Sequence, residues 1–191
     1  MLDEDILRRL REEAISCLPM HGTHSYEHTE RVYRTCMLLG NNVGADESVL
    51  LPAALLHDIG RGEKNHASAG AKRAKSILMK IGFKKERIKM VADAISAHSF
   101  SERKTAVSVE AKVLSDADKL DALGAVGIYR AAAYSGEEPR GIEEFVAHFH
   151  DKLLGLSDLF YTEDARLMAE NRISYMRAYL DQLDLELSQE A

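Results

Sequence analysis

Apolar residues recur at helical spacing along almost the whole chain, and this periodicity constrains the fold more than any other feature. Ile6, Leu10 and Ala14, for example, share one helical face, and no strand-like alternation is sustained. Because Pro52 fits best in a first helical turn, the start of the third helix is left open. The sequence predicts an all-α helical bundle, with a loop over 135–141 and helices over about 3–18, 25–41, 46–58, 66–81, 84–98, 109–122, 124–134, 142–154 and 162–187.

The length of 191 residues is enough for one domain with a full core, and no repeat, low-complexity segment or linker is visible. We therefore expect a single domain over 1–191. The composition, 46% hydrophobic and 29% charged, is typical of an ordinary globular protein. The net charge of −6 argues against general nucleic-acid binding, although a local basic pocket remains compatible with a small anionic substrate.

The two cysteines and the N-terminal segment bear on the cellular compartment. Cys17 and Cys36 form no metal-binding or redox spacing, so we interpret them as reduced thiols. The first 16 residues are heavily charged and do not resemble a signal peptide, and no apolar run approaches 18 residues. A cytoplasmic protein without membrane contact is expected.

The pair His57-Asp58 carries most of the functional information in the sequence. It follows the apolar run Ala53–Leu56 directly and is followed by Ile59-Gly60. Burying an imidazole beside a carboxylate costs several kcal/mol unless hydrogen bonds or a cation satisfy both groups. A bound metal removes that cost by taking a nitrogen and an oxygen as ligands.

Further ligand-type residues are spread along the chain. His28 has His24 one helical turn before it, so either histidine could face a site, although His24 and His21 are more simply interpreted as solvated loop residues. In the helical run around Asp118, the aspartates either cap helices and pair with Lys119 and Arg130, or one of them binds a cation. His66 and His98 lie between the His-Asp pair and this run.

Together, these residues resemble the HD superfamily of metal-dependent phosphohydrolases over about residues 22–136, with helices over 142–190 expected to pack on that core. His28 is followed by Arg31-Val32, and the pair stands in Ala-Leu-Leu-His-Asp-Ile-Gly. The family's last aspartate precedes a basic residue and leucine, which selects Asp118 over Asp116 and Asp121. The stretch 116–127 is similar to small bacterial and archaeal HD hydrolases, some of which cleave nucleoside triphosphates.

The resemblance implies a metal site formed by His28, His57, Asp58 and Asp118. Two imidazoles and two carboxylates suit Mn²⁺, Fe²⁺, Co²⁺, Ni²⁺ or Zn²⁺, with Mg²⁺ a further candidate. His66 and His98 leave two alternatives open. Either they bind a second ion that Asp58 bridges, or a single ion is bound and they contact substrate or donate protons.

The expected catalytic residues are Asp58, His66, His98 and, by its adjacency to Asp118, Lys119. Phosphate groups need positive charge, for which the candidates are Arg31, Arg61, Lys64 and Arg130. The predicted function is hydrolysis of a small phosphorylated metabolite, most plausibly a nucleotide. The rival hypotheses are a di-iron oxygenase and a non-catalytic nucleotide sensor. A homodimer is a possible assembly under each of these hypotheses.

Overall fold

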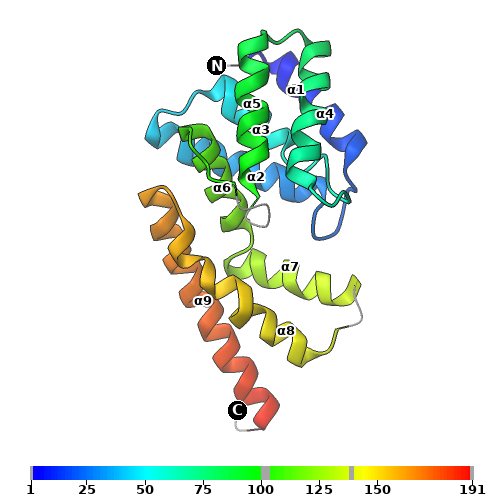
Figure 1. The fold of residues 1–191 in the computed structure, drawn as a ribbon. Helices are drawn as coiled ribbons and strands as arrows, with labels where there is room; N and C mark the ends of the chain where they lie inside the picture. Colours follow the sequence, from blue (N-terminus) through cyan, green and yellow to red (C-terminus); the bar gives the residue numbers. More distant parts are fainter. Residues whose placement is uncertain (1, 100–103, 138–139, 190–191) are drawn as a thin grey trace. The chain divides into compact units, whose positions relative to one another are not determined.

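The computed structural model describes residues 2–99, 104–137 and 140–189, and helix is the only regular secondary structure in those ranges. The predicted all-α class is therefore confirmed. The chain divides into two compact units, Met1–Asp118 and Lys119–Ala191, and the boundary falls near the end of helix α6 (Val109–Asp121) (Figure 1). The expectation of a single domain stays a prediction, and the two units are described separately.

The first unit is built around a central buried helix, α3 (Glu47–Leu56). Every residue from Val49 to Leu56 is buried, because α1, α2 and α5 all pack against this helix. Helices α4 and α5 also pack against each other (Figure 1). The remaining helices of this unit are α1 (Glu4–Cys17), α2 (Tyr26–Val43), α4 (His66–Ile81), α5 (Lys85–His98) and most of α6.

The ends of these helices follow local chemistry. The Asp46 side chain accepts from the backbone N–H of Ser48, which is an N-cap that starts α3 at Glu47. Helix α4 ends at Gly82, whose φ of 100° suits glycine. The expectation that Pro52 belongs in a first turn is wrong, since Pro52 is buried inside α3. The surrounding packing therefore outweighs the intrinsic preference of proline.

The second unit consists of α7 (Gly124–Glu137), α8 (Ile142–His148), the π-helix η2 (Phe149–Leu153), the 3₁₀-helix η3 (Leu154–Leu159) and α9 (Glu163–Ser188). Helix α9 packs against α7 and η3 (Figure 1). Residues 142–154 are helical as predicted, but beyond His148 the backbone changes from α to π and then 3₁₀ geometry. The predicted loop over 135–141 also begins too early, because α7 continues to Glu137.

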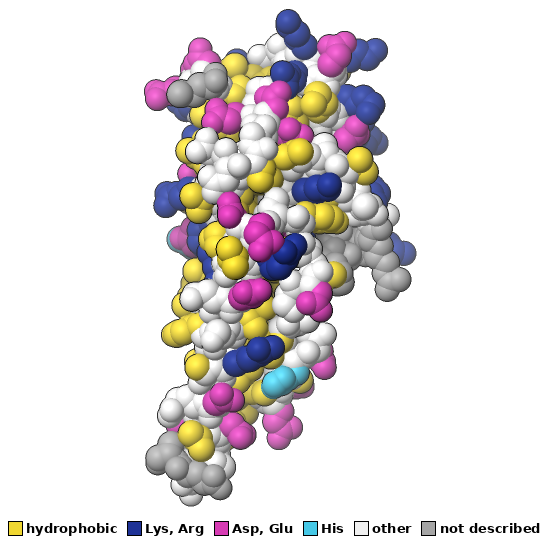
Figure 2. All heavy atoms as spheres, turned by 90° about the vertical axis from the view of Figure 1, so that its left-hand side faces the viewer, with side chains coloured by type: hydrophobic (Ala, Val, Ile, Leu, Met, Phe, Trp, Pro, Cys, Tyr) yellow, Lys and Arg dark blue, Asp and Glu magenta, His cyan; other side chains and the backbone are white. Residues whose placement is uncertain are grey.

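The surface carries charges of both signs. Figure 2 shows acidic and basic side chains interspersed with apolar ones over the face in view. Among the described residues, no helix combines the length and apolar character that crossing a bilayer requires.

Candidate metal centre

Helix α3 carries His57 and Asp58 into the interior of the first unit. His57 is the C-cap of the helix, and its side chain is completely buried. The Asp58 side chain is 1% exposed. All residues from Val49 to Leu56 are buried as well. The pair therefore could not reach the surface unless this helix unpacked.

Four other helices of this unit present the remaining predicted ligands to the same place. His28 is buried on the inner face of α2, His66 is the first residue of α4, and His98 is the last residue of α5. Asp118 comes from α6 and is partly exposed. We refer to these four residues together with His57 and Asp58 as the His/Asp cluster.

Gly60 brings the start of α4 close to the His57-Asp58 pair. A Cβ atom at Gly60 would lie 2.3 Å from the carbonyl oxygen of His66 and 2.4 Å from the backbone nitrogen of Gly70. Such contacts are impossible for any larger residue, so the two backbones can pack this closely only with glycine. The close packing explains why His66 reaches the cluster although only eight positions separate it from Asp58.

The distances within the cluster suit one cation. His28 Nε2 lies 3.2 Å from His57 Nε2 and 3.3 Å from Asp118 Oδ1. Asp58 Oδ2 lies 3.8 Å from His28 Nε2 and 3.9 Å from His57 Nε2. Ligand atoms that each lie about 2.1 Å from one ion are roughly 3–4 Å apart. The structure thus brings ligand atoms of His28, His57 and Asp118 together, and it places Asp58 Oδ2 within 4 Å of both imidazoles.

Backbone hydrogen bonds orient two of the imidazoles. His57 Nδ1 lies 2.8 Å from the carbonyl oxygen of Ala54, and His98 Nδ1 lies 2.6 Å from that of Ile95. Because a carbonyl only accepts, each Nδ1 must carry the donated proton. In the neutral imidazole, the Nε2 lone pair then faces the cluster, which is the orientation that metal-binding histidines typically adopt.

The ionisable groups of the cluster shift the pKa values of one another. Burial lowers the pKa of His57 to about 4 despite the nearby Asp58, so this imidazole is neutral at neutral pH. Burial alone would raise the pKa of both carboxyls, but neighbouring imidazoles outweigh that effect, and the pKa of Asp58 and of Asp118 lies below its ordinary value. Burial would lower the pKa of His98, but Asp58 and Asp118 raise it above its ordinary value. The centre thus contains two carboxylate anions beside a neutral His57.

The two oxygens of Asp58 face different groups. Oδ2 lies 3.0 Å from Arg61 Nη2 and 3.4 Å from His24 Nδ1. Oδ1 lies 3.9 Å from His66 Nε2 and 3.8 Å from His98 Nε2. Oδ1 is buried and has no hydrogen-bond partner. A buried carboxylate oxygen in that state is unfavourable without a cation, so these residues fit a metal.

The predicted basic residues lie in different surroundings. Arg61 is partly buried and donates from Nη2 and Nε to Asp58 Oδ2. Lys64 is exposed in the loop between α3 and α4, and Arg31 is partly exposed on α2. In the second unit, Arg130 forms a buried ion pair with Asp121 at 3.1 Å. Lys119, also in that unit, is buried, and its ammonium lies 5.0 Å from the Tyr161 ring centre.

His24 lies beside the cluster, as the alternative that it faces a site had allowed. It is a partly exposed loop residue, but its Nδ1 lies 2.7 Å from Arg61 Nη2 and its ring centre lies 6.0 Å from that of His28, so it is not simply solvated. His24, His28 and Asp58 also form one of three groups, among the described residues, that could hold a metal ion. The spacing of four between His24 and His28 is the signal in the sequence that points to this side chain.

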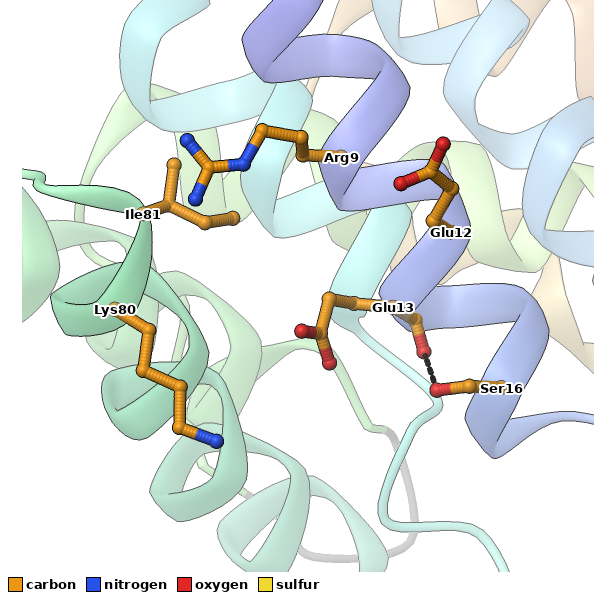
Figure 3. Close-up of a pocket in the computed structure, with 6 residues that line it drawn as sticks. All are labelled: Arg9, Glu12, Glu13, Ser16, Lys80 and Ile81. Atoms are coloured by element: carbon orange, nitrogen blue, oxygen red, sulfur yellow. Dashed lines mark hydrogen bonds between the residues drawn. The ribbon is translucent and has the colours of Figure 1, made fainter.

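A separate surface pocket of about 250 Å³ is lined by both charged and apolar side chains of α1 and α4. Figure 3 shows Arg9, Glu12, Glu13 and Ser16 on one helix and Lys80 and Ile81 on the other. The side chains of this pocket are not those of the His/Asp cluster. It lacks the buried, converging nitrogen and oxygen ligands that make the cluster a candidate metal centre.

A known protein family covers the segment that contains this cluster. Residues 25–123, about half of the chain, match the model of the HD domain family. The chain belongs to the HD domain family. The matched segment contains all six residues of the His/Asp cluster. The predicted family membership is therefore confirmed.

Relatives of this HD domain protein cover nearly its full length. It is 34% identical to Bacillus subtilis YpgQ over 173 residues, which span 86% of this chain and 84% of YpgQ. The crystal structure of YpgQ in complex with ADP has a TM-score of 0.82 at 32% identity, covering 96% of this chain and 95% of that one. An HD-superfamily hydrolase from Bacillus thuringiensis has a TM-score of 0.78 at 29% identity, covering 97% and 98%.

Proposed function

We propose that this HD domain protein is a metal-dependent phosphohydrolase that acts on a small phosphorylated metabolite, most plausibly a nucleotide. The observation that carries the proposal is the His/Asp cluster, in which a buried oxygen of Asp58 has no hydrogen-bond partner. Similarity to the Bacillus thuringiensis HD-superfamily hydrolase supports the reaction class. The complex of YpgQ with ADP supports a nucleotide as the substrate class.

In this proposal, His28, His57, Asp58 and Asp118 hold one divalent cation. When bound, the cation supplies Lewis-acid polarisation of a phosphoryl oxygen and lowers the pKa of a coordinated water. His57 contributes a fixed nitrogen ligand, because its Nδ1 proton is already donated to Ala54. Asp58 and Asp118 contribute the negative charge that balances the ion.

The substrate would be oriented by basic groups around the centre. Arg61 and Lys64 belong to the loop that leaves the His57-Asp58 pair, so they are the first candidates for phosphate contact, followed by Arg31. Arg130 is the weakest of the predicted substrate-binding residues, because its charge is already paired with Asp121. A planar guanidinium such as that of Arg61 can bind a phosphate through two parallel hydrogen bonds.

His66 and His98 would act on the side of Asp58 Oδ1. Both Nε2 atoms lie within 4 Å of that oxygen, and the ring centres are 5.6 Å apart. The His66 side chain is 12% exposed and that of His98 is 1% exposed, so His66 is better placed to exchange a proton with solvent. Lys119 is retained as a candidate for charge stabilisation because it adjoins Asp118 in the chain.

The test is a substrate screen with verified metal-free protein. Nucleoside mono-, di- and triphosphates are incubated with Mn²⁺, Co²⁺, Ni²⁺, Zn²⁺, Fe²⁺ or Mg²⁺, and phosphate and pyrophosphate are both quantified. We expect no turnover without metal and restored turnover with at least one ion. Full activity of the metal-free protein would refute the proposal, whereas tight nucleotide binding without any turnover would favour the sensor hypothesis.

A di-iron oxygenase is the second candidate, and the surroundings of Asp58 Oδ1 are the observation that favours it. Oδ1 lies near His66 and His98, whereas Oδ2 faces His28 and His57. A carboxylate that bridges two ions needs such an arrangement. Anaerobically purified protein with two irons, visible absorbance and substrate-dependent O₂ uptake would support this candidate. Colourless protein that hydrolyses nucleotides with one ion per chain would exclude it.

A further inference from the structure

His24, Arg61 and Asp58 form a three-residue contact at the edge of the His/Asp cluster. His24 lies in the loop before α2, which is closed by a hydrogen bond from the Tyr26 N–H to the carbonyl oxygen of Pro19. The side chains of His24 and Arg61 are 36% and 32% exposed, whereas that of Asp58 is 1% exposed. The buried carboxylate is thus contacted by two groups that extend towards solvent.

The hydrogen-bond roles in this contact follow from the chemistry of arginine. A guanidinium only donates, so His24 Nδ1, at 2.7 Å from Arg61 Nη2, must be the acceptor. Arg61 Nη2 also lies 3.0 Å from Asp58 Oδ2, so its two N–H groups are shared between His24 and Asp58. His24 Nδ1 and Asp58 Oδ2 lie 3.4 Å apart because both accept hydrogen bonds from Arg61 Nη2.

This arrangement fixes the carboxylate as well as the guanidinium. Arg61 donates from both Nη2 and Nε to the same oxygen, Oδ2. Since the plane of a carboxylate turns about a single bond, holding Oδ2 also determines where Oδ1 points. His24 adds a further contact to the guanidinium by accepting from Nη2.

We propose that His24 is a positioning residue, which holds Arg61 so that Arg61 holds Asp58 in its metal-binding orientation. The inference rests on the proposed function only in taking Asp58 as a metal ligand. Partners that orient a ligand from behind typically change metal affinity by about 10–100-fold when they are removed. His24 therefore acts through Arg61 and does not coordinate the ion.

The competing role for His24 is direct coordination, because His24, His28 and Asp58 form a group that could hold a cation. In that arrangement the Nδ1 lone pair would have to leave Arg61 and bind the ion instead. The two roles predict opposite effects of removing Arg61. Its loss weakens metal binding if Arg61 orients Asp58, but strengthens it if Arg61 competes with the ion for His24.

The experiment measures Mn²⁺ affinity by calorimetric titration of the full-length, metal-free protein. We expect His24→Ala to weaken binding about tenfold or more, and Arg61→Ala to weaken it at least as much. The double variant should bind no more weakly than Arg61→Ala alone, because both changes break one chain of contacts. His21→Ala is the matched control, since His21 is exposed and pairs with Glu27, and it should bind like the wild type.

Two conservative variants separate positioning from general damage. The amide oxygen of Asn can take the place of Nδ1, so His24→Asn should stay within about threefold of wild type. Gln places its oxygen near the position of Nε2, so His24→Gln should bind as weakly as His24→Ala. Tighter binding by Arg61→Ala, wild-type affinity in His24→Ala, or equal weakness of the Asn and Gln variants would overturn the inference.

This readout is independent of turnover. A protein that binds Mn²⁺ with the expected pattern but hydrolyses no nucleotide would refute the proposed function and leave the role of His24 intact. Circular dichroism of each variant without metal checks that it folds. If His24→Ala does not fold, the Asn and Gln pair together with Arg61→Ala decides the question.

Discussion

Two of the three aspartates of helix α6, Asp118 and Asp121, lie in different surroundings. Asp118 lies 3.3 Å from His28 Nε2 in the first unit, among imidazoles and a second carboxylate. Asp121 lies 3.1 Å from Arg130 Nη1 in the second unit, where the two side chains form an ion pair. Both side chains of this pair meet an opposite charge, whereas one buried oxygen in the His/Asp cluster has no hydrogen-bond partner.

The comparison shows why burial of a charged residue alone does not identify a functional site. Both Asp121 and Arg130 are buried, yet their charges are neutralised by each other, as expected for a structural ion pair. In the His/Asp cluster, Asp58 has Arg61 on one oxygen and no hydrogen-bond partner on the other. The buried oxygen without a hydrogen-bond partner and the converging imidazoles, and not burial of charge alone, make the cluster a candidate for metal binding.

The largest expected effect comes from replacing each of these aspartates in turn. Asp118→Ala should lose the bound metal and reduce turnover about 10³-fold or more, because Lewis-acid stabilisation amounts to several kcal/mol. Asp121→Ala should keep its metal and most of its turnover. It should instead lose about 3–5 kcal/mol of unfolding free energy, because the buried Arg130 loses its ion pair with Asp121.

Elemental analysis, nucleotide turnover and urea unfolding on both variants check this contrast. An Asp121→Ala/Arg130→Met double variant serves as a control, since it removes both charges and should recover much of the stability lost in the single variant. Loss of metal from Asp121→Ala alone, with Asp118→Ala unaffected, would show that the roles of the two aspartates are reversed.

The next effect concerns the side of Asp58 that faces His66 and His98. If the centre holds one ion, His66→Ala and His98→Ala should leave the metal content at about one per chain and lower turnover by roughly 10²–10⁴-fold. Asp58→Ala should empty the site. Metal content that falls from about two ions to about one in either histidine variant would establish a second ion and revive the oxygenase hypothesis.

The fold is largely predictable from helical spacing because most helices here end at local signals. Helix α4 runs over 66–81 as predicted, since Gly82 stops it, and α5 differs by one residue at its start. The region after His148 is not predictable in this way. The change from α to π and then 3₁₀ geometry follows no proline and no change of apolar spacing, so it depends on packing within the second unit.

The candidate site is predictable as a set of residues but not as a geometry. The resemblance selects Asp118, which lies 3.3 Å from His28 Nε2, and the search for positive charge beside the His57-Asp58 pair includes Arg61. It does not reveal that His24 contacts Arg61, because both lie in loops 37 positions apart. Contacts between loops depend on how the helices that carry them pack, and no local pattern records that.

Gly60 tests whether the cluster depends on close backbone packing. A Cβ at this position meets the backbone of His66 and Gly70, so Gly60→Ala should cost about 1–3 kcal/mol of unfolding free energy. It should also weaken metal binding by displacing α4. Gly155 in the second unit has open space where a Cβ would lie, with nothing within 4 Å, so Gly155→Ala should be neutral or slightly stabilising. Equal stability of the two variants in urea would contradict this account.

The smallest effect concerns the two cysteines of the first unit. Burial raises the pKa of the Cys36 thiol well above its ordinary value, and the charges of Asp118 and Asp116 add to the effect. Cys17 is exposed. Because the thiolate is the reactive form, iodoacetamide at pH 8 should modify Cys17 and leave Cys36 unmodified until the protein is unfolded. Mass spectrometry of the labelled peptides measures both sites in one sample.

The Asp118→Ala variant makes this labelling informative about the cluster. Burial is the larger cause of the raised pKa, so Cys36 should stay protected when the Asp118 charge is removed, provided that the first unit remains packed. Rapid labelling of Cys36 in that variant would mean that Asp118→Ala opens the core around α2. The loss of metal would then reflect disruption of the first unit, and the contrast between Asp118 and Asp121 would no longer concern metal binding.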